Sequence, residues 1–328
     1  MDISCAFATS LDTPEHIEIA EKLGYTRAWC YDSPAIYPDV WMTLALAAKR
    51  TRTIGLGPGV LIPHLRHVLT TASAVGTLEA LAPGRVMVAM GAGFTGRRAM
   101  GQRPLQWKDV GSYAVALKAL LRGEEVEWDG ANIKMMHLDR FAPARPIEIS
   151  ILMAASGPKG MEVARSAADG LIGASKPEAE DKVRFAHIVQ MATGTVLDAG
   201  EPPTSERAFE AAAHTGALVL HHAYEAKRAT EIPGGAEYAR VIDALPERRR
   251  HLAVHEGHLV TPNAIDRKFI TSEQLMRMGS VADAAVWQRR LRQAEADGIT
   301  EVAYQPGGYE IERELRAFAT MAGLKPRP

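Results

Sequence analysis

Residues 54–97 decide the fold; they read IGLGPGVLIPHLRHVLTTASAVGTLEALAPGRVMVAMGAGFTGR. Ile54 to Ile62 is apolar with three glycines and predicts a buried strand, and His67 to Leu81 follows as an amphipathic helix that a Pro-Gly pair ends. Val86 to Met90 predicts a second strand, which runs into a glycine-rich turn. Strand, helix and strand at this spacing indicate a parallel α/β sheet.

The same alternation continues on both sides of this stretch. Further strands are predicted at Asp2–Thr9, Tyr25–Tyr31, Pro146–Met153, Gly170–Ala174, Phe185–Leu197 and Thr300–Gln305. Helices are predicted from Thr13, which suits an N-cap before Pro14, and at Trp41–Lys49, Leu105–Leu121, Pro158–Ala168, Val281–Ala296 and Ile311–Met321.

Eight strand candidates favour one (β/α)₈ barrel over residues 1–328. A doubly wound open sheet would show the same alternation, but glycine and polar residues follow several different strands here, as in barrels whose active sites form at the strand ends. Two segments depart from the alternation and are predicted insertions: about 124–142, with a turn at Asp129-Gly130, and about 204–260, which is mostly helical.

Composition excludes several classes of protein. The chain has 38 basic and 39 acidic side chains and a net charge of -1, so it carries no electrostatic footprint for nucleic acid or an anionic membrane. It shows neither a signal peptide nor a long apolar span, which favours a cytoplasmic protein. Cys5 and Cys30 lie in predicted strands and are interpreted as small core residues of a reducing compartment.

Two glycine-rich stretches are candidates for contact with a ligand. Glycines in the strand 54–63 imply a bulge or a close approach of backbone to a flat group, with a simple kink as the alternative. Gly91, Gly93 and Gly96 match GxGxxG spacing, yet the acidic residue expected about 20 residues later is missing. We therefore expect anion or cofactor contact of some kind there, against an ordinary flexible loop, but no dinucleotide fingerprint.

A third stretch, ILMAASGPKG (151–160), predicts a phosphate-binding helix end. A strand runs directly into Ser156-Gly157-Pro158, and Pro158 suits the first position of the next helix. The free amides and positive dipole of that helix end, with Lys159 beside them, would attract an anion. An ordinary turn between strand and helix is the alternative.

The stretch RHLAVHEGH (250–258) gathers His251, His255, Glu256 and His258. It does not follow the HExxH pattern, and its glycine argues for a loop, so no metal ligand is predicted. A polar substrate pocket with an acid/base pair is the favoured interpretation, against a solvated or buried structural cluster. The adjacent pair His221-His222, within an apolar helix, is interpreted as packing.

Taken together, these motifs resemble the luciferase-like flavin and deazaflavin oxidoreductases, in particular the branch of methylenetetrahydromethanopterin reductase. The resemblance is carried by the order and spacing of AWCYDS (28–33), IGLGPGV (54–60), GRVMVAMGAGFTGRRAMG (84–101), AASGPKGMEVARSAADG (154–170) and ADGITEVAYQPGG (296–308). No single motif decides it, but the motifs run along most of the chain.

The resemblance implies a flavin or deazaflavin ring at the mouth of the barrel. A non-prolyl cis peptide behind the ring would fall at Gly59-Val60, and Asp32 would lie near the reactive edge. Gly91, Gly93 and Thr95 would line the cofactor side chain, and its phosphate would bind at Ala155, Ser156, Gly157, Pro158 and Lys159. Ser33 departs from the branch, which often has histidine there, and the 250–258 stretch is expected to compensate.

The leading functional hypothesis is hydride transfer between the deazaflavin coenzyme F420 and a small organic substrate, with Asp32, His255 and Glu256 handling protons. An FMN-dependent monooxygenase is the first alternative. A hydrolase or lyase without a cofactor, using His255, Glu256 and His258, is the second, and a non-catalytic flavin-binding protein is the third. The resemblance also suggests a homodimer, for which the helix 67–81 could supply a surface.

Overall fold

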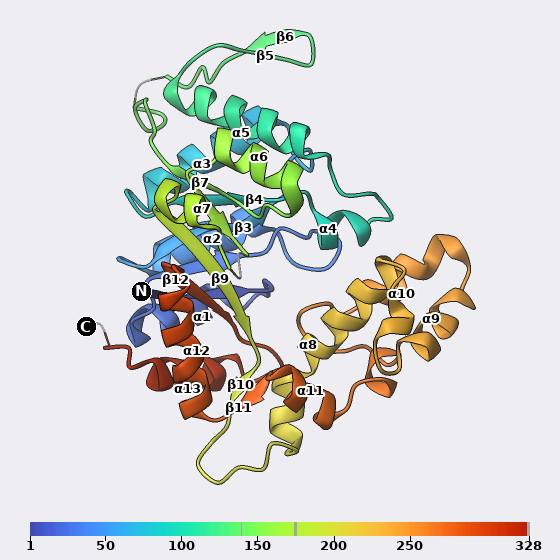
Figure 1. Cartoon of the computed structure of the whole chain (residues 1–328). Coiled ribbons are helices and arrows are strands. Elements are labelled where there is room, and N and C mark those ends of the chain that lie inside the picture. Colours follow the sequence, from blue (N-terminus) through green and yellow to red (C-terminus); the bar gives the residue numbers. More distant parts are fainter. Residues whose placement is uncertain (139, 174–175, 327–328) are drawn as a thin grey trace.

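A computed structural model of the chain describes residues 1–138, 140–173 and 176–326. Eight parallel strands close into a barrel in the order β1-β12-β9-β8-β7-β4-β3-β2 (Figure 1). The closed barrel confirms the predicted fold class. Its strands are β1 (Asp2–Phe7), β2 (Arg27–Cys30), β3 (Gly55–Leu61), β4 (Met87–Met90), β7 (Ser150–Met153), β8 (Gly170–Ile172), β9 (His187–Thr193) and β12 (Glu301–Gln305).

The outer helices alternate with these strands and cover the barrel. They are α1 (Thr13–Leu23), α2 (Val40–Arg50), α3 (Val68–Leu81), α5 (Trp107–Arg122), α6 (Gly157–Ala167), α7 (Ala179–Arg184), α12 (Ala284–Ala296) and α13 (Ile311–Ala322). Their apolar faces pack on the outward side chains of the strands, while a smaller set, including Trp29, Leu152 and Val189, fills the interior. The barrel is therefore a packed core, and a ligand can enter only at an end.

Buried cysteines and close glycine contacts belong to this core. Cys5 and Cys30 are free thiols with no exposed surface, as expected for core residues. A Cβ atom on Gly57 would lie 1.7 Å from the carbonyl oxygen of Met87, so β3 and β4 approach at a distance that only glycine allows.

Two segments extend from the barrel. The hairpin of β5 (Val126–Trp128) and β6 (Ala131–Ile133) lies above α5, within the first predicted insertion. A lobe of helices follows β10 (Thr195–Val196) and is seen at the right of Figure 1: α8 (Glu206–Glu225), α9 (Gly235–Asp243), α10 (Arg250–His255) and α11 (Ser272–Met278). This lobe has a hydrophobic cluster of its own and continues to Met278, beyond the expected boundary near residue 260.

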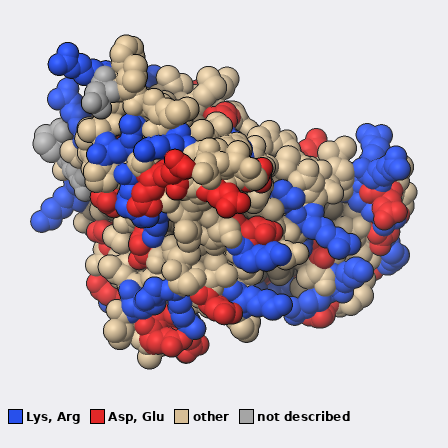
Figure 2. All heavy atoms as spheres, turned by 90° about the horizontal axis from the view of Figure 1, so that it is seen from above, with Lys and Arg blue, Asp and Glu red and all other residues tan. Residues whose placement is uncertain are grey.

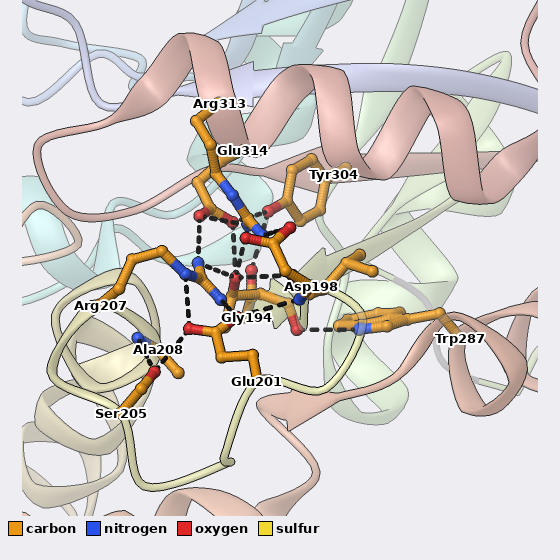
Figure 3. Close-up of polar contacts among 12 residues, drawn as sticks. Gly194, Asp198, Glu201, Ser205, Arg207, Ala208, Trp287, Tyr304, Arg313 and Glu314 are labelled. Atoms are coloured by element: carbon orange, nitrogen blue, oxygen red, sulfur yellow. Dashed lines mark hydrogen bonds and ion pairs between the residues drawn. The ribbon is translucent and has the colours of Figure 1, made fainter.

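The lobe is joined to the barrel wall by a cluster of charged side chains, which we call the ionic cluster: Asp198, Glu201, Arg207, Arg313 and Glu314 (Figure 3). Arg207 Nη1 donates to Glu314 Oε1 at 2.9 Å, and Arg313 Nη1 donates to the same oxygen at 2.8 Å. Glu314 also accepts a 2.7 Å hydrogen bond from Thr195 Oγ1. The start of α8 is thereby tied to α13.

Several element boundaries differ from the sequence predictions. Phe185–Leu197 is not one strand: Gly194 has a φ of 122° and separates β9 from the two-residue β10. Val281 and Ala282 form β11, so the helix expected from Val281 starts at Ala284. Asp12, and not Thr13, occupies the N-cap position of α1. The last residue of the strand predicted at Gly170–Ala174 lies outside the described residues.

The surface carries charges of both signs. In Figure 2 acidic and basic side chains are interspersed over the face that is shown, in keeping with the net charge of -1. Within the described residues, no helix is long and apolar enough to cross a bilayer.

Candidate functional site

A pocket opens at the carboxyl ends of the barrel strands. Its lining comes from six consecutive strands of the barrel and the residues that directly follow them. These residues are Tyr31, Asp32 and Ser33 after β2, Gly59 and Val60 in β3 and Ile62 after it, 91–96 after β4, Ala154 after β7, Ile172 and Gly173 at the end of β8, and Met191 in β9. Tyr37 and, from the lobe, Leu259 complete the wall. Barrel enzymes place their active sites at this end, because the loops there converge from every strand.

The glycines of β3 and β4 shape one side of this pocket. The Gly59-Val60 peptide bond is cis, which confirms the prediction for that bond. A Cβ atom on Gly91 would lie 2.9 Å from Val60 Cγ2, so a larger residue there would displace Val60. Gly93 has a φ of 78° and begins the short helix α4 (Phe94–Arg98), which the sequence analysis treated as part of a loop. Backbone and small side chains thus form a shallow, mostly apolar surface.

Asp32 lies in the pocket wall and is held by Arg66. Arg66 Nη1 lies 2.9 and 2.8 Å from the two Asp32 oxygens, while Arg66 Nη2 donates to Asp39 at 2.8 Å. Only 3% of Asp32 is exposed. Burial raises the pKa of the Asp32 carboxyl, and the Arg66 guanidinium opposes this shift. Asp32 is therefore a positioned carboxylate at the site, with a partner that the sequence analysis did not identify.

The start of α6 lies beside the pocket, next to Ala154. Ser156 occupies the N-cap position but its side chain makes no capping hydrogen bond, and residues 156–159 are exposed. A Cβ atom on Gly157 would meet nothing within 4 Å, which shows open space over this backbone. The amides of the first turn are thus accessible to an anion, as predicted for Ala155 to Lys159.

Three buried histidines lie behind the pocket wall, and we call them the histidine cluster: His221, His255 and His258. Thr95, which lines the pocket, has its Oγ1 atom 3.2 Å from His258 Nε2. His258 Nδ1 lies 2.7 Å from His221 Nδ1, and His221 Nε2 lies 3.1 Å from Asp266 Oδ2. Burial and the two neighbouring histidines lower the pKa of His258 well below its ordinary value, so it is neutral near pH 7.

Glu256, the third residue of this stretch predicted to be catalytic, lies apart from the histidine cluster. Glu256 is exposed and faces a separate surface hollow, with His255 at its edge. The Nε2 atom of His255 lies 2.8 Å from Glu225, and among the described residues no hydrogen bond joins His255 to Glu256. The structure instead brings His255 and His258 together with His221.

The sequence analysis treated His221 and His222 alike, as packing residues, but their surroundings differ. His221 is buried and hydrogen-bonded, whereas His222 is exposed. The helical period could have placed His221 on the buried face with Ala217 and Leu220, and His222 outside that face. No local pattern indicated Asp266, Glu225 or Arg66, which come from other elements.

The lobe is held over the pocket by polar contacts at Leu259. Gln305 Nε2 donates to the Leu259 carbonyl at 2.8 Å, and the hydroxyl of Tyr31 donates to Gln305 Oε1 at 2.9 Å. Tyr37 donates a short hydrogen bond to the carbonyl of His258. These contacts fix one lobe residue in the pocket wall.

Comparisons with characterised proteins agree with this architecture. The chain is 33% identical over 266 residues to F420-dependent glucose-6-phosphate dehydrogenase of Beutenbergia cavernae, covering 70% of this chain and 75% of that protein. It is 30% identical over 227 residues to 5,10-methylenetetrahydromethanopterin reductase of Methanolobus tindarius, covering 68% of this chain and 66% of the relative. For the reductase of Archaeoglobus fulgidus the match spans 49% of the relative's length.

Solved structures show the same fold at lower identity. The coenzyme F420-dependent tetrahydromethanopterin reductase of Methanopyrus kandleri superposes with a TM-score of 0.65 at 18% identity, covering 99% of this chain and 100% of that one. An F420-dependent secondary alcohol dehydrogenase gives 0.66 at 15% identity, covering 98% and 97%. The family model for luciferase-like monooxygenases matches residues 10–314. The chain is therefore a member of the luciferase-like monooxygenase family.

Proposed function

We propose that this protein is an oxidoreductase that uses the deazaflavin coenzyme F420 to transfer a hydride to or from a small organic substrate. The observation that carries the proposal is the pocket at the barrel mouth, with Gly59, Gly91 and Gly93 in its wall and the uncapped start of α6 beside it. Relatives with 30–33% identity are named as users of this coenzyme or as methylenetetrahydromethanopterin reductases.

The residues present fit a flat ring with a phosphate-bearing tail. Gly59, Val60 and Gly91 line the pocket with little side-chain volume, and a Cβ atom added at Gly91 would lie 2.9 Å from Val60 Cγ2. Exposed amides and Lys159 at the start of α6 provide a site for phosphate. When bound, a deazaflavin supplies two-electron hydride chemistry, and the protein supplies position and surroundings.

Side chains of this chain would orient the substrate beside the ring. Asp32 presents a buried carboxylate that Arg66 fixes in place, and Ser33 offers a hydroxyl in the same wall. Leu259, Phe94 and Met191 contribute apolar area that limits access of water. Thr95 is the pocket residue that connects to the histidine cluster through His258.

The alternatives differ in what they require of this geometry. A cofactor-free hydrolase would need His255, Glu256 and His258 together in the pocket, and among the described residues they do not line it. The FMN-dependent alternative remains chemically compatible, because solved luciferase-like neighbours include a monooxygenase in complex with FMN. A homodimer and a cytoplasmic location remain predictions from the sequence and the family resemblance.

Anaerobic fluorescence titration with coenzyme F420 and, separately, with FMN tests the proposal. We expect selective binding of F420, and we expect Ala154→Trp to weaken it at least tenfold because the indole fills the pocket. Leu46→Trp on the exposed face of α2 is the matched control and should bind like the unmodified protein. Preference for FMN would replace the proposal with the monooxygenase alternative, and binding of neither would refute both.

A further inference from the structure

The three side chains of the histidine cluster converge on one point. One ring nitrogen from each of His221, His255 and His258 lies within 4.8 Å of the other two. The residues are almost completely buried, with 1%, 3% and 3% of their surfaces exposed. They come from α8, from the end of α10 and from the loop that follows it.

A separate group holds each ring from its outer side. His221 Nε2 contacts the Asp266 carboxylate at 3.1 Å, His255 Nε2 contacts the Glu225 carboxylate at 2.8 Å, and His258 Nε2 contacts the Thr95 hydroxyl at 3.2 Å. Arg98 pairs with Glu225 on its far side. Histidines that ligate metals are oriented in this way, with a carboxylate, carbonyl or water on the nitrogen that does not bind the metal.

Direct hydrogen bonding inside the cluster leaves two groups unsatisfied. A proton shared by the Nδ1 atoms of His221 and His258 serves only those two rings. His255 Nδ1 is buried and has no hydrogen-bond partner among the described residues, which is unfavourable for a buried polar atom. Asp266 is fully buried, and in the described ranges no lysine or arginine lies within 4.0 Å of its carboxylate.

We propose that His221, His255 and His258 bind one divalent transition-metal ion of the zinc class. Neutral imidazole nitrogens suit such ions, and three of them leave a fourth position for water. Two nitrogens bound to tetrahedral zinc lie roughly 3.3 Å apart, so His221 and His258 must separate by about 0.6 Å when the ion replaces their shared proton. The ion would compensate Asp266 and satisfy His255.

The position of the site suggests what the ion does. Its ligands join two helices of the lobe to the loop that carries Leu259, and Thr95 contacts the cluster from the pocket wall. A bound ion would therefore fix the lobe over the pocket. This proposal stands on the histidine geometry and is independent of the coenzyme.

Metal titration of tag-free protein, first stripped with a chelator, tests the site. We expect one equivalent of Zn²⁺ to bind by calorimetry, and Co²⁺ to give the visible absorption of a tetrahedral site. His255→Gln and His258→Gln should each weaken Zn²⁺ binding at least tenfold. Asp266→Asn, which keeps the shape of a supporting residue, should weaken it about 10–100-fold.

The adjacent exposed histidine provides the control. His222→Gln lies one residue from His221 on the solvent face of α8 and should bind Zn²⁺ like the unmodified protein. Circular dichroism identifies any variant that fails to fold, and the Asp266→Asn result then decides. Absence of bound Zn²⁺ in the unmodified protein, or binding that survives both His255→Gln and His258→Gln, would overturn the proposal.

Discussion

The ionic cluster and the histidine cluster lie at opposite ends of α8 and join the lobe to the barrel in different ways. Arg207 is in the first turn of α8 and His221 is near its end. In the ionic cluster every carboxylate has an arginine within hydrogen-bond distance (Figure 3). In the histidine cluster the Asp266 carboxylate contacts the His221 ring and accepts from the backbone N–H of Asn263, with no lysine or arginine within 4.0 Å among the described residues, and His255 Nδ1 has no hydrogen-bond partner there.

This difference separates a structural contact from a site with binding capacity. Paired charges satisfy one another, so the ionic cluster gains nothing from an added ion. Neutral imidazoles with a buried carboxylate behind them can accept a cation or a proton. The two polar clusters therefore have different chemistry, and perturbing each of them should have different consequences.

The largest effect is expected from Glu314→Gln in the ionic cluster. Glu314 is 1% exposed and contacts both Arg207 and Arg313, so the substitution weakens two partly buried ion pairs at once, although the arginines keep Glu201 and Asp198 as partners. We expect a loss of about 3 kcal/mol in the free energy of unfolding, measured by urea denaturation.

Glu237→Gln is the matched control for that substitution. Glu237 pairs with Arg240 on the exposed surface of α9, and such pairs contribute at most about 1 kcal/mol. Equal effects of Glu314→Gln and Glu237→Gln would show that the ionic cluster contributes little to joining the lobe to the barrel.

A smaller effect is expected from Asp266→Asn when a chelator is present. The substitution leaves no lysine or arginine unpaired, because the Asp266 carboxylate contacts the ring of His221, and asparagine keeps one acceptor oxygen. We expect a loss of about 1 kcal/mol in the free energy of unfolding. A loss as large as that of Glu314→Gln would mean that the Asp266 carboxylate contributes as much to stability as the carboxylate of Glu314 in the ionic cluster.

The last prediction concerns the pH ranges in which stability is lost, which differ between His214 in the lobe and Glu201 in the ionic cluster. Burial lowers the pKa of His214, in the lobe, from 6.5 to about 4. As pH decreases from about 6.5 to 4, the unfolded chain takes up a proton at this residue before the folded chain does, so the free energy of unfolding falls. The hydrogen bond from Arg207 lowers the pKa of Glu201 from 4.5 to about 2, so its stabilisation is lost between those values.

Urea denaturation across this pH range distinguishes the two contributions. Glu201→Gln should flatten only the lower part of the stability profile and leave the decline between pH 6.5 and 4 unchanged. A change confined to the upper part would contradict the assignment of the lower window to Glu201.

Much of the barrel could be predicted because its signals are local. Short apolar runs, each followed by glycine or polar residues and an amphipathic helix, repeat along the chain and identify strands such as Ile54–Ile62. Short elements were missed for the same reason. The helix α4 and the two-residue strands β10 and β11 are too brief to show a periodic pattern.

Partners distant in sequence explain what was missed at the site. Asp32 was a candidate because it directly follows a predicted strand. Its partner Arg66 lies 34 residues further along, and no pattern in the sequence around Arg66 indicates that it binds Asp32. Glu256 was selected because it stands beside His255, yet Glu256 is exposed whereas His255 is buried and contacts Glu225. His258 was selected as part of a polar group, but its partner His221, and Asp266 beyond His221, come from elements on either side.

The sequence by itself determined the order of most strands and helices and the glycines that let β3 approach β4 closely, and it predicted the start of α6 as a place for an anion. These depend on backbone conformation and on periodicity over a few residues. Only the tertiary structure decided which polar side chains meet. It paired Asp32 with Arg66, separated Glu256 from the pocket, and assembled three histidines from α8, α10 and the following loop, because burial selects partners by position in space and not by distance along the chain.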